Sequence, residues 1–281
     1  MHLQLLDMTS QTDQAIALGR DLLAAYADQR GVLEAMLQSS SIWQDRDLTR
    51  KVIDRLKAVS PANSVAVQVY DARWQLAGSP DNVQLRALLQ QLNELVRQAP
   101  TRTDLRLALS QVHVQLGDMS AAVQQFREAV RQNPNDIGLL IELARLHIAA
   151  KDPTQARMVL QGLQQRAPDD PQLRTNLAYI YAEIGDRHQA LTLAEAVKAA
   201  DDPQGRARLL VATLYQQHGR LDDARRIYDE LLAQPPSVPT VLAAASFYLA
   251  QQDSTGAMAA LEKLSLVEPD EVRRHVIRGG F

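Results

Sequence analysis

Residues Thr103–Asp136 read TDLRLALSQVHVQLGDMSAAVQQFREAVRQNPND, and this stretch decides the fold. Apolar residues recur at helical spacing in both halves, at Leu105, Leu109, Val112 and Leu116 and then at Ala122, Val123, Phe126, Ala129 and Val130. Gly117 suits the left-handed end of the first helix, because glycine has no Cβ to clash there. Pro134 disfavours a helical residue before it and so ends the second helix. The stretch predicts two amphipathic helices that need neighbours to bury their apolar faces.

The same pattern repeats along the chain. Ala122 has counterparts at Ala156, Ala190 and Ala224, each 34 residues further on, and at Ala257 after 33 residues. The closing proline recurs at Pro61, Pro100, Pro134, Pro168, Pro203, Pro236 and Pro269. A 34-residue period with two helices and small residues at fixed positions is the signature of the tetratricopeptide repeat (TPR). The chain therefore resembles the TPR family over nearly all of its length.

This resemblance implies an all-α fold, a right-handed TPR solenoid in which helix–turn–helix repeats form a superhelix. We expect one continuous solenoid over residues 1–281. Its predicted repeats are 1–29 (partial), 30–63, 64–102, 103–136, 137–170, 171–204, 205–237 and 238–271, with a further helix starting in 272–281. Because both ends interrupt a repeat, we expect the chain to be a segment of a longer protein.

Four details of the packing can be predicted. The repeat 64–102 has 39 residues, and its extra residues fall in the turn-rich run Gly78–Asn82. Asp71 stands where the family has a small residue, so we expect it to disturb close helix packing. A helix is expected at Arg187–Ala200. Gly256 should weaken its helix by about 1 kcal/mol relative to alanine.

Composition and charge exclude several classes of function. The chain has 30 Lys and Arg against 33 Asp and Glu, a net charge of −3. This balance gives no basic surface for nucleic acid or for an anionic membrane. No apolar run is long enough to span a bilayer, so no membrane insertion is expected. The absence of cysteine excludes disulfides and thiolate metal sites.

Catalytic and cofactor motifs are missing as well. The sequence has no nucleophile elbow, no phosphate-binding glycine loop and no zinc-protease helix motif, so we expect no enzyme activity and no cofactor. His113 and His147 lie 34 residues apart at one equivalent position, and Tyr181, Tyr215 and Tyr248 follow there in the next three repeats. The resemblance implies that this position packs within the repeat, which favours packing over metal binding for both histidines.

The resemblance also implies that the first helix of each pair lines a concave groove. Two tracks of residues would face a partner there: Gln111, Arg145, Tyr179 and Thr213 on one track, and Leu107, Ile141, Thr175 and Leu209 on the other. Amides can hydrogen-bond an extended backbone, and the aliphatic residues can accept apolar side chains. The five-residue clamp with which some TPR co-chaperones hold a C-terminal carboxylate is not expected, because only Asn176 matches its pattern.

The sequence therefore favours a non-catalytic scaffold for protein–protein interaction, with a partner peptide or domain in the groove. Repeats rich in alanine, glutamine and arginine look like those of long bacterial envelope TPR proteins, such as exopolysaccharide secretion scaffolds and TPR lipoproteins. That similarity implies a periplasmic location, with the cytoplasm as the alternative. Two other functions stay open: a regulatory or substrate-recruiting region of a larger enzyme, and a polysaccharide-binding module. The second is less favoured, because the groove tracks offer a single aromatic residue, Tyr179.

Overall fold

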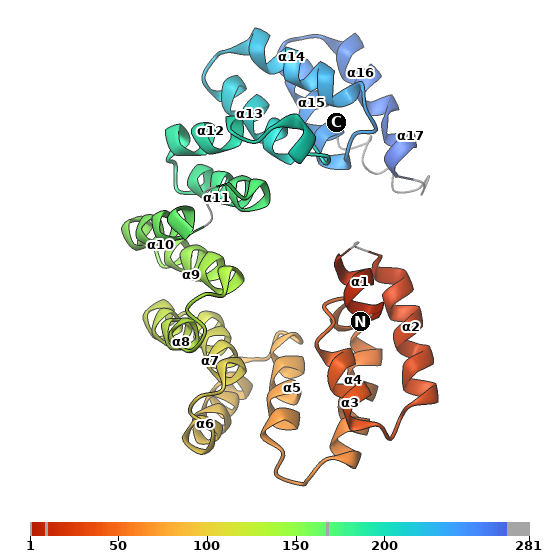
Figure 1. The fold of residues 1–281 in the computed structure, drawn as a ribbon, viewed down its shortest axis with the longest axis vertical. Coiled ribbons are helices and arrows are strands. Elements are labelled where there is room, and N and C mark those ends of the chain that lie inside the picture. The colour runs from red at the N-terminus through yellow and green to blue at the C-terminus, as the bar shows by residue number, and fades with distance from the viewer. Residues whose placement is uncertain (1, 9–10, 167–168, 269–281) are drawn as a thin grey trace. The chain divides into compact units, whose positions relative to one another are not determined.

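The computed structural model describes residues 2–8, 11–166 and 169–268, and Figure 1 draws their helices along the chain. No strand occurs among these described residues. They divide into two compact units, one within 1–150 and the other within 151–281. Each predicted repeat from 30–63 to 238–271 holds a pair of α-helices, and the described part of 238–271 holds a short third one, Leu264–Val267. The single continuous solenoid stays a prediction, and the predicted helix in 272–281 lies outside the described residues.

The first unit contains nine described α-helices and a short 3-10 helix. Their bounds are α1 (His2–Met8), α2 (Thr12–Ala25), α3 (Arg30–Leu37), η1 (Ile42–Gln44), α4 (Arg46–Val59), α5 (Val65–Leu76), α6 (Asn82–Gln98), α7 (Thr103–Gln115), α8 (Met119–Gln132) and α9 (Ile137–Ala149). The α6 helix begins at a capping box: the Asp81 carboxylate accepts from the backbone N–H of Gln84, and the Gln84 side chain accepts from the N–H of Asp81. This cap lies within the turn-rich run Gly78–Asn82 of the 39-residue repeat.

The second unit continues the helix pairs. Its described elements are α10 (Pro153–Arg166), α11 (Pro171–Glu183), α12 (Arg187–Glu195), η2 (Ala199–Asp201), α13 (Arg206–Gln217), α14 (Leu221–Leu232), α15 (Val238–Ala250), α16 (Ser254–Glu262) and α17 (Leu264–Val267). The predicted helix Arg187–Ala200 is wrong at its end, because the backbone becomes extended at Lys198. The segment that follows places buried Asp202 at the start of α13, where its carboxylate accepts from the N–H of Ala207 and of Arg208.

Small residues lie where the helices of a pair cross, as predicted. Within the two units, Ala122, Ala190, Ala224 and Ala257 are all buried. In the pair α7–α8 the facing residue is Ser110, which is also buried and donates its hydroxyl hydrogen to the Ala122 carbonyl at 2.9 Å. A larger side chain at these crossings would force the helices apart.

Five of the turns between successive helices have a left-handed residue at one equivalent position. Gly117, Gly185 and Gly219 have φ of 78°, 78° and 75° there. Lys151 and Gln252 take the same place with φ of 59°. A residue with a Cβ is strained in this conformation by about 1–2 kcal/mol, which glycine avoids.

Replacing Lys151 or Gln252 by glycine should therefore stabilise the protein. We expect each change to raise the free energy of unfolding by about 0.5–1 kcal/mol, since the relieved strain exceeds the extra chain entropy of glycine. Urea denaturation followed by circular dichroism measures the effect. Gln251→Gly is the matched control, because Gln251 has φ of −90° and should lose stability on the same change. Loss of stability in Gln252→Gly would contradict the prediction.

A polar contact to the preceding repeat occurs at the repeat position that His147, Tyr215 and Tyr248 share. The ring nitrogen Nε2 of His147 lies 3.3 Å from the Arg127 guanidinium of α8, the helix before it. In the second unit Tyr215 donates to the Glu195 carboxylate and Tyr248 donates to Asp229. Burial of His147, at 2% exposed, confirms its predicted packing role. The partner, however, lies in the preceding repeat, which the sequence analysis did not predict.

Burial raises the pKa of most tyrosines in the described structure. It is the largest cause of the raised pKa for Tyr70, Tyr179, Tyr181, Tyr228 and Tyr248. A raised folded-state pKa means that the neutral phenol is favoured by folding. Its contribution to stability is complete below the unfolded pKa of about 10 and is lost as pH rises toward the folded value.

The protein should consequently unfold more easily in alkali. We expect the urea midpoint to be nearly constant between about pH 7 and pH 9 and to fall steeply above about pH 10. The measurement is a denaturation series across this range. Tyr228→Phe should reduce the dependence on pH, because that side chain cannot ionise. A midpoint that is flat up to about pH 11 would show that tyrosine burial does not limit stability.

Gly256 lies in α16, as predicted, but the expected advantage of alanine is absent. A Cβ on Gly256 would lie 2.9 Å from the ring carbon Cδ1 of Tyr248 and 2.9 Å from the carboxylate of Asp253. Asp253 caps α16 by accepting from the Gly256 N–H at 2.8 Å. Alanine would therefore displace either the ring or the cap, so glycine fits this helix for steric reasons.

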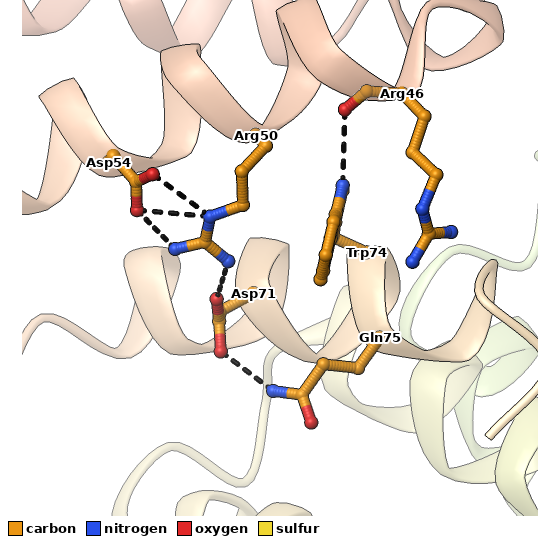
Figure 2. Close-up of polar contacts among 6 residues, drawn as sticks. All are labelled: Arg46, Arg50, Asp54, Asp71, Trp74 and Gln75. Carbon is orange, nitrogen blue, oxygen red and sulfur yellow. Dashed lines mark hydrogen bonds and ion pairs between the residues drawn. The ribbon is translucent and has the colours of Figure 1, made fainter.

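Asp71 on α5 takes part in an ion pair with α4 (Figure 2). One nitrogen of Arg50 donates to Asp71 at 2.6 Å, and its Nε donates to Asp54 at 3.0 Å. The Gln75 amide donates to the second oxygen of Asp71 at 2.7 Å. The carboxylate that the sequence analysis expected to disturb packing is thus paired with the preceding repeat, which compensates part of its desolvation.

Candidate interaction groove

A hollow of about 490 Å³ lies among α7, α8 and α9 of the first unit. Its lining residues are Leu107, Ser110, Gln111, Val114, Phe126, Leu139, Glu142, Arg145, Leu146 and Ala149. Most of these side chains are apolar, and the charged and amide groups come from three residues. The hollow is large enough for one bulky side chain of a partner.

Helical spacing explains how the walls form. Leu107, Gln111 and Val114 lie on one face of α7, at i, i+4 and i+7. On α9, Leu139, Leu146 and Ala149 share a face in the same way. Phe126 enters from α8 and is half-buried between these walls. The result is an apolar interior with contributions from two successive repeats.

Polar groups at the hollow offer both charges and an amide. Glu142 and Arg145 form an ion pair at 3.0 Å, with side chains that are 54% and 49% exposed. Gln111 is exposed, and its side chain makes no hydrogen bond to any residue that the structure describes. The hydroxyl of Ser110 is already used inside the helix pair. The free amide of Gln111 can therefore hydrogen-bond a partner backbone beside the apolar interior.

Three residues of the predicted groove are brought together here: Leu107, Gln111 and Arg145. Ile141 is half-buried on α9 and is not among the residues that line the hollow. The sequence analysis missed the contributions of Phe126 and Leu146. The spacing of Leu139, Leu146 and Ala149 was the available signal, because it marks a second apolar face on α9.

The other four predicted residues lie in the second unit. Tyr179 is half-buried and donates its hydroxyl hydrogen to the Arg206 carbonyl at 2.9 Å. Thr213 donates to the Leu209 carbonyl at 2.9 Å, within its own helix. Thr175 is only 5% exposed and donates to the Pro171 carbonyl, so its predicted place on an open groove face needs correction. These hydroxyl hydrogens are used within the unit.

A second hollow, of about 790 Å³, lies between α2 and α4. Its lining includes Leu23 and Leu48, together with Arg20 and Asp45, which form an ion pair at 2.7 Å. The Asp45 carboxylate accepts a hydrogen bond from the backbone N–H of Leu48 and another from the Arg20 side chain. These bonds, the first more than the second, hold the pKa of Asp45 below its usual range. Basic and acidic residues are equally numerous in its lining, which gives no preference for either charge.

Across the described residues, none of the helices combines the length and the apolar character that crossing a lipid bilayer requires.

Comparison with known proteins identifies repeats of one kind. Two sequence models of the tetratricopeptide repeat match the chain, one at residues 114–180 and 147–214 and the other at 89–137 and 209–271. Together these matches cover more than half of the chain. No curated protein matches it.

Several solved structures are similar in fold. Yeast Tom70 is 14% identical with a TM-score of 0.61, over 96% of this chain and 58% of Tom70. The chain matched in the Naa15/Naa10 complex bound to HypK-THB is 13% identical with a TM-score of 0.63, over 96% of this chain and 56% of that one. A tetratricopeptide repeat protein from Parabacteroides merdae is 12% identical with a TM-score of 0.55, over 95% of this chain and 97% of that one. This chain thus spans little more than half the length of the first two, and at such identities the similarity shows the fold alone.

Proposed function

The chain belongs to the tetratricopeptide repeat family, with the all-α solenoid fold expected from its sequence, and on that premise we propose that it is a non-catalytic scaffold that binds a partner protein. Repeats of this family generally bind proteins or peptides. The observation that carries the proposal is the hollow among α7, α8 and α9. An apolar side chain of the partner would occupy it, and Gln111 would hydrogen-bond the partner backbone.

A crosslinking experiment tests this proposal. A photoreactive amino acid replaces Val114, which lines the hollow and is 40% exposed. The protein is irradiated in an extract of the cells that express it, and the crosslinked partner is identified by mass spectrometry. The same probe at Val83, which is 77% exposed and outside the hollow, is the matched control.

We expect a specific crosslink at residue 114 and none at residue 83. Adding Leu146→Glu should abolish this crosslink, because a carboxylate would enter the apolar interior, while circular dichroism stays unchanged. A crosslink that survives Leu146→Glu, or that forms equally at residue 83, would move the binding surface away from the hollow.

The finer proposal concerns the biological setting. We infer that the scaffold acts in a bacterial envelope assembly, in the periplasm, for exopolysaccharide synthesis or secretion. The alanine-, glutamine- and arginine-rich repeats support this setting. Fractionation of the full-length protein, together with exopolysaccharide release from a deletion strain, tests it. A cytoplasmic protein, or unchanged release, would contradict it.

Direct binding of polysaccharide is less well supported than protein binding. Both tryptophan rings carry an arginine over one face: Arg73 lies 4.4 Å from the Trp43 ring centroid, and Arg46 lies 4.2 Å from that of Trp74. An aromatic face that stacks on arginine is not free to stack on a sugar ring. We therefore do not propose a carbohydrate site.

A further inference from the structure

An arginine that stacks on a tryptophan ring can still donate hydrogen bonds to a carboxylate. Stacking uses the flat face of the guanidinium, and the N–H groups point outward in its plane. Arg50 shows the outcome: it lies 5.1 Å from the Trp74 ring centroid, and its donors bind the carboxylates of Asp54 and Asp71. Figure 2 shows these bonds. A stacked arginine at this joint between α4 and α5 thus binds carboxylates edge-on.

Arg73, on α5, is stacked on Trp43 but has no such carboxylate. No hydrogen bond or ion pair joins its guanidinium to any residue in the described part of the chain. The carboxylates that act on this region already have partners: Glu34 pairs with Arg30 at 2.8 Å, and Asp104 pairs with Arg102. One positive charge therefore remains without a matching negative charge.

The environment of Arg73 makes an unpaired cation unfavourable. The side chain is half-buried, and burial lowers the pKa of its guanidinium. A partly desolvated charge gains more from an ion pair than an exposed charge does. The free chain thus keeps a desolvated, oriented cation whose binding to an external carboxylate loses little entropy.

Tyr70 supplies a second donor on the same face of α5. It lies three residues before Arg73, which places both side chains on one side of the helix. Tyr70 and Trp43 pack against the same apolar cluster, which contains Leu33 and Met36. The Tyr70 hydroxyl makes no hydrogen bond to a described residue. A carboxylate beside Arg73 could accept from both the guanidinium and the phenol.

We propose that Trp43, Tyr70 and Arg73 form a docking site for an aspartate or glutamate side chain of the partner protein. This inference rests on the proposed function, since the acidic residue belongs to the same partner that fills the hollow. Charge complementarity selects the occupant: the site holds an unmatched cation and two oriented donors. Arg46 does not offer the same site, because acidic residues outnumber basic ones in the lining of its hollow, where Asp13, Asp45 and Asp47 lie with Arg20 and Arg46.

Selection from a library of random peptides tests whether the chain prefers peptides that contain an acidic residue. A phage library of random peptides of about a dozen residues is selected on the purified chain and on its Arg73→Gln variant. On the wild type we expect enriched peptides to carry a large apolar residue together with Asp or Glu. On Arg73→Gln the apolar residue should persist and the acidic enrichment should disappear.

The affinity of one selected peptide for the wild type and for each variant then shows which residues contact its acidic side chain. Arg73→Gln should weaken its binding roughly tenfold, as expected for a lost charge-assisted hydrogen bond. Tyr70→Phe should weaken it by a smaller factor. Changing the acidic residue of the peptide to its amide should weaken wild-type binding to a similar degree, with no further loss on Arg73→Gln. Arg46→Gln is the matched control and should bind like the wild type.

The outcomes separate this inference from the proposed function. Peptides with an apolar residue but no acidic preference would overturn the acidic site and leave the scaffold proposal intact. No enriched peptide on the wild type would overturn both. Equal weakening by Arg46→Gln and Arg73→Gln would reject the specific site, because it would indicate a general charge effect. Thermal unfolding of each variant confirms that the fold is retained.

Discussion

Replacing Gly205 by alanine is expected to lower the free energy of unfolding by about 2–4 kcal/mol. Gly205 precedes α13 with φ of 66°, a conformation in which a Cβ is strained. A Cβ there would also lie 2.5 Å from the Cδ2 atom of Leu231, a buried residue of α14. Both costs add, because the backbone strain and the collision are separate effects.

Urea denaturation of Gly205→Ala and Gly219→Ala measures the two costs separately. Gly219 has φ of 75°, but a Cβ there would meet nothing within 4 Å. Gly219→Ala should therefore lose only about 1–2 kcal/mol. Equal losses for the two variants would show that Leu231 moves aside without penalty.

Phe247→Ala is the other change with a large expected effect, a loss of about 3–5 kcal/mol. Phe247 on α15 is fully buried, and its ring centroid lies 5.0 Å from that of Tyr228 and 5.4 Å from that of Tyr248. Truncation would leave a cavity that two rigid neighbouring rings cannot fill. The loss of the edge-to-face contact with Tyr248 and of the tilted contact with Tyr228 adds to the cost.

Thermal and urea denaturation of Phe247→Ala should agree on this loss. Phe247→Leu is the matched control, since leucine fills most of the space, and it should lose clearly less. A loss below about 1 kcal/mol for Phe247→Ala would contradict the picture of a tightly packed aromatic cluster in the second unit.

The helices and their crossings could be predicted from the sequence, because both depend on local periodicity. Alanine at a fixed place in the repeat, as at Ala122 and Ala190, marks a crossing whatever the neighbouring repeat contains. Glycine at Gly117 and Gly185 marks the turn in the same way. Family membership followed from these positions, since they define the repeat itself.

Contacts between repeats could not be predicted in the same way. Periodicity shows which face of a helix is apolar, but it does not show which residues of the next helix meet that face. The partners of His147 and Tyr248 were missed for this reason. Thr175 was assigned to the groove by its place in the repeat, whereas its burial depends on its surroundings. Leu107 is one of the predicted residues that line the hollow, and Phe126 was missed because it comes from another helix.

The hydrogen bonds from Tyr215 to Glu195 and from Tyr248 to Asp229 affect how the chain tolerates the deletion or duplication of a repeat. A genetic deletion of Gly205–Ser237 would remove one whole repeat and bring the helix of Glu195 next to the helix of Tyr248. The phenol would exchange the Asp229 carboxylate for that of Glu195, and the new joint would keep its hydrogen bond. The joint between Arg127 and His147 carries no carboxylate and is not interchangeable in this way. Loss or duplication of the repeat Gly205–Ser237 is therefore better tolerated than a change at the joint between α8 and α9.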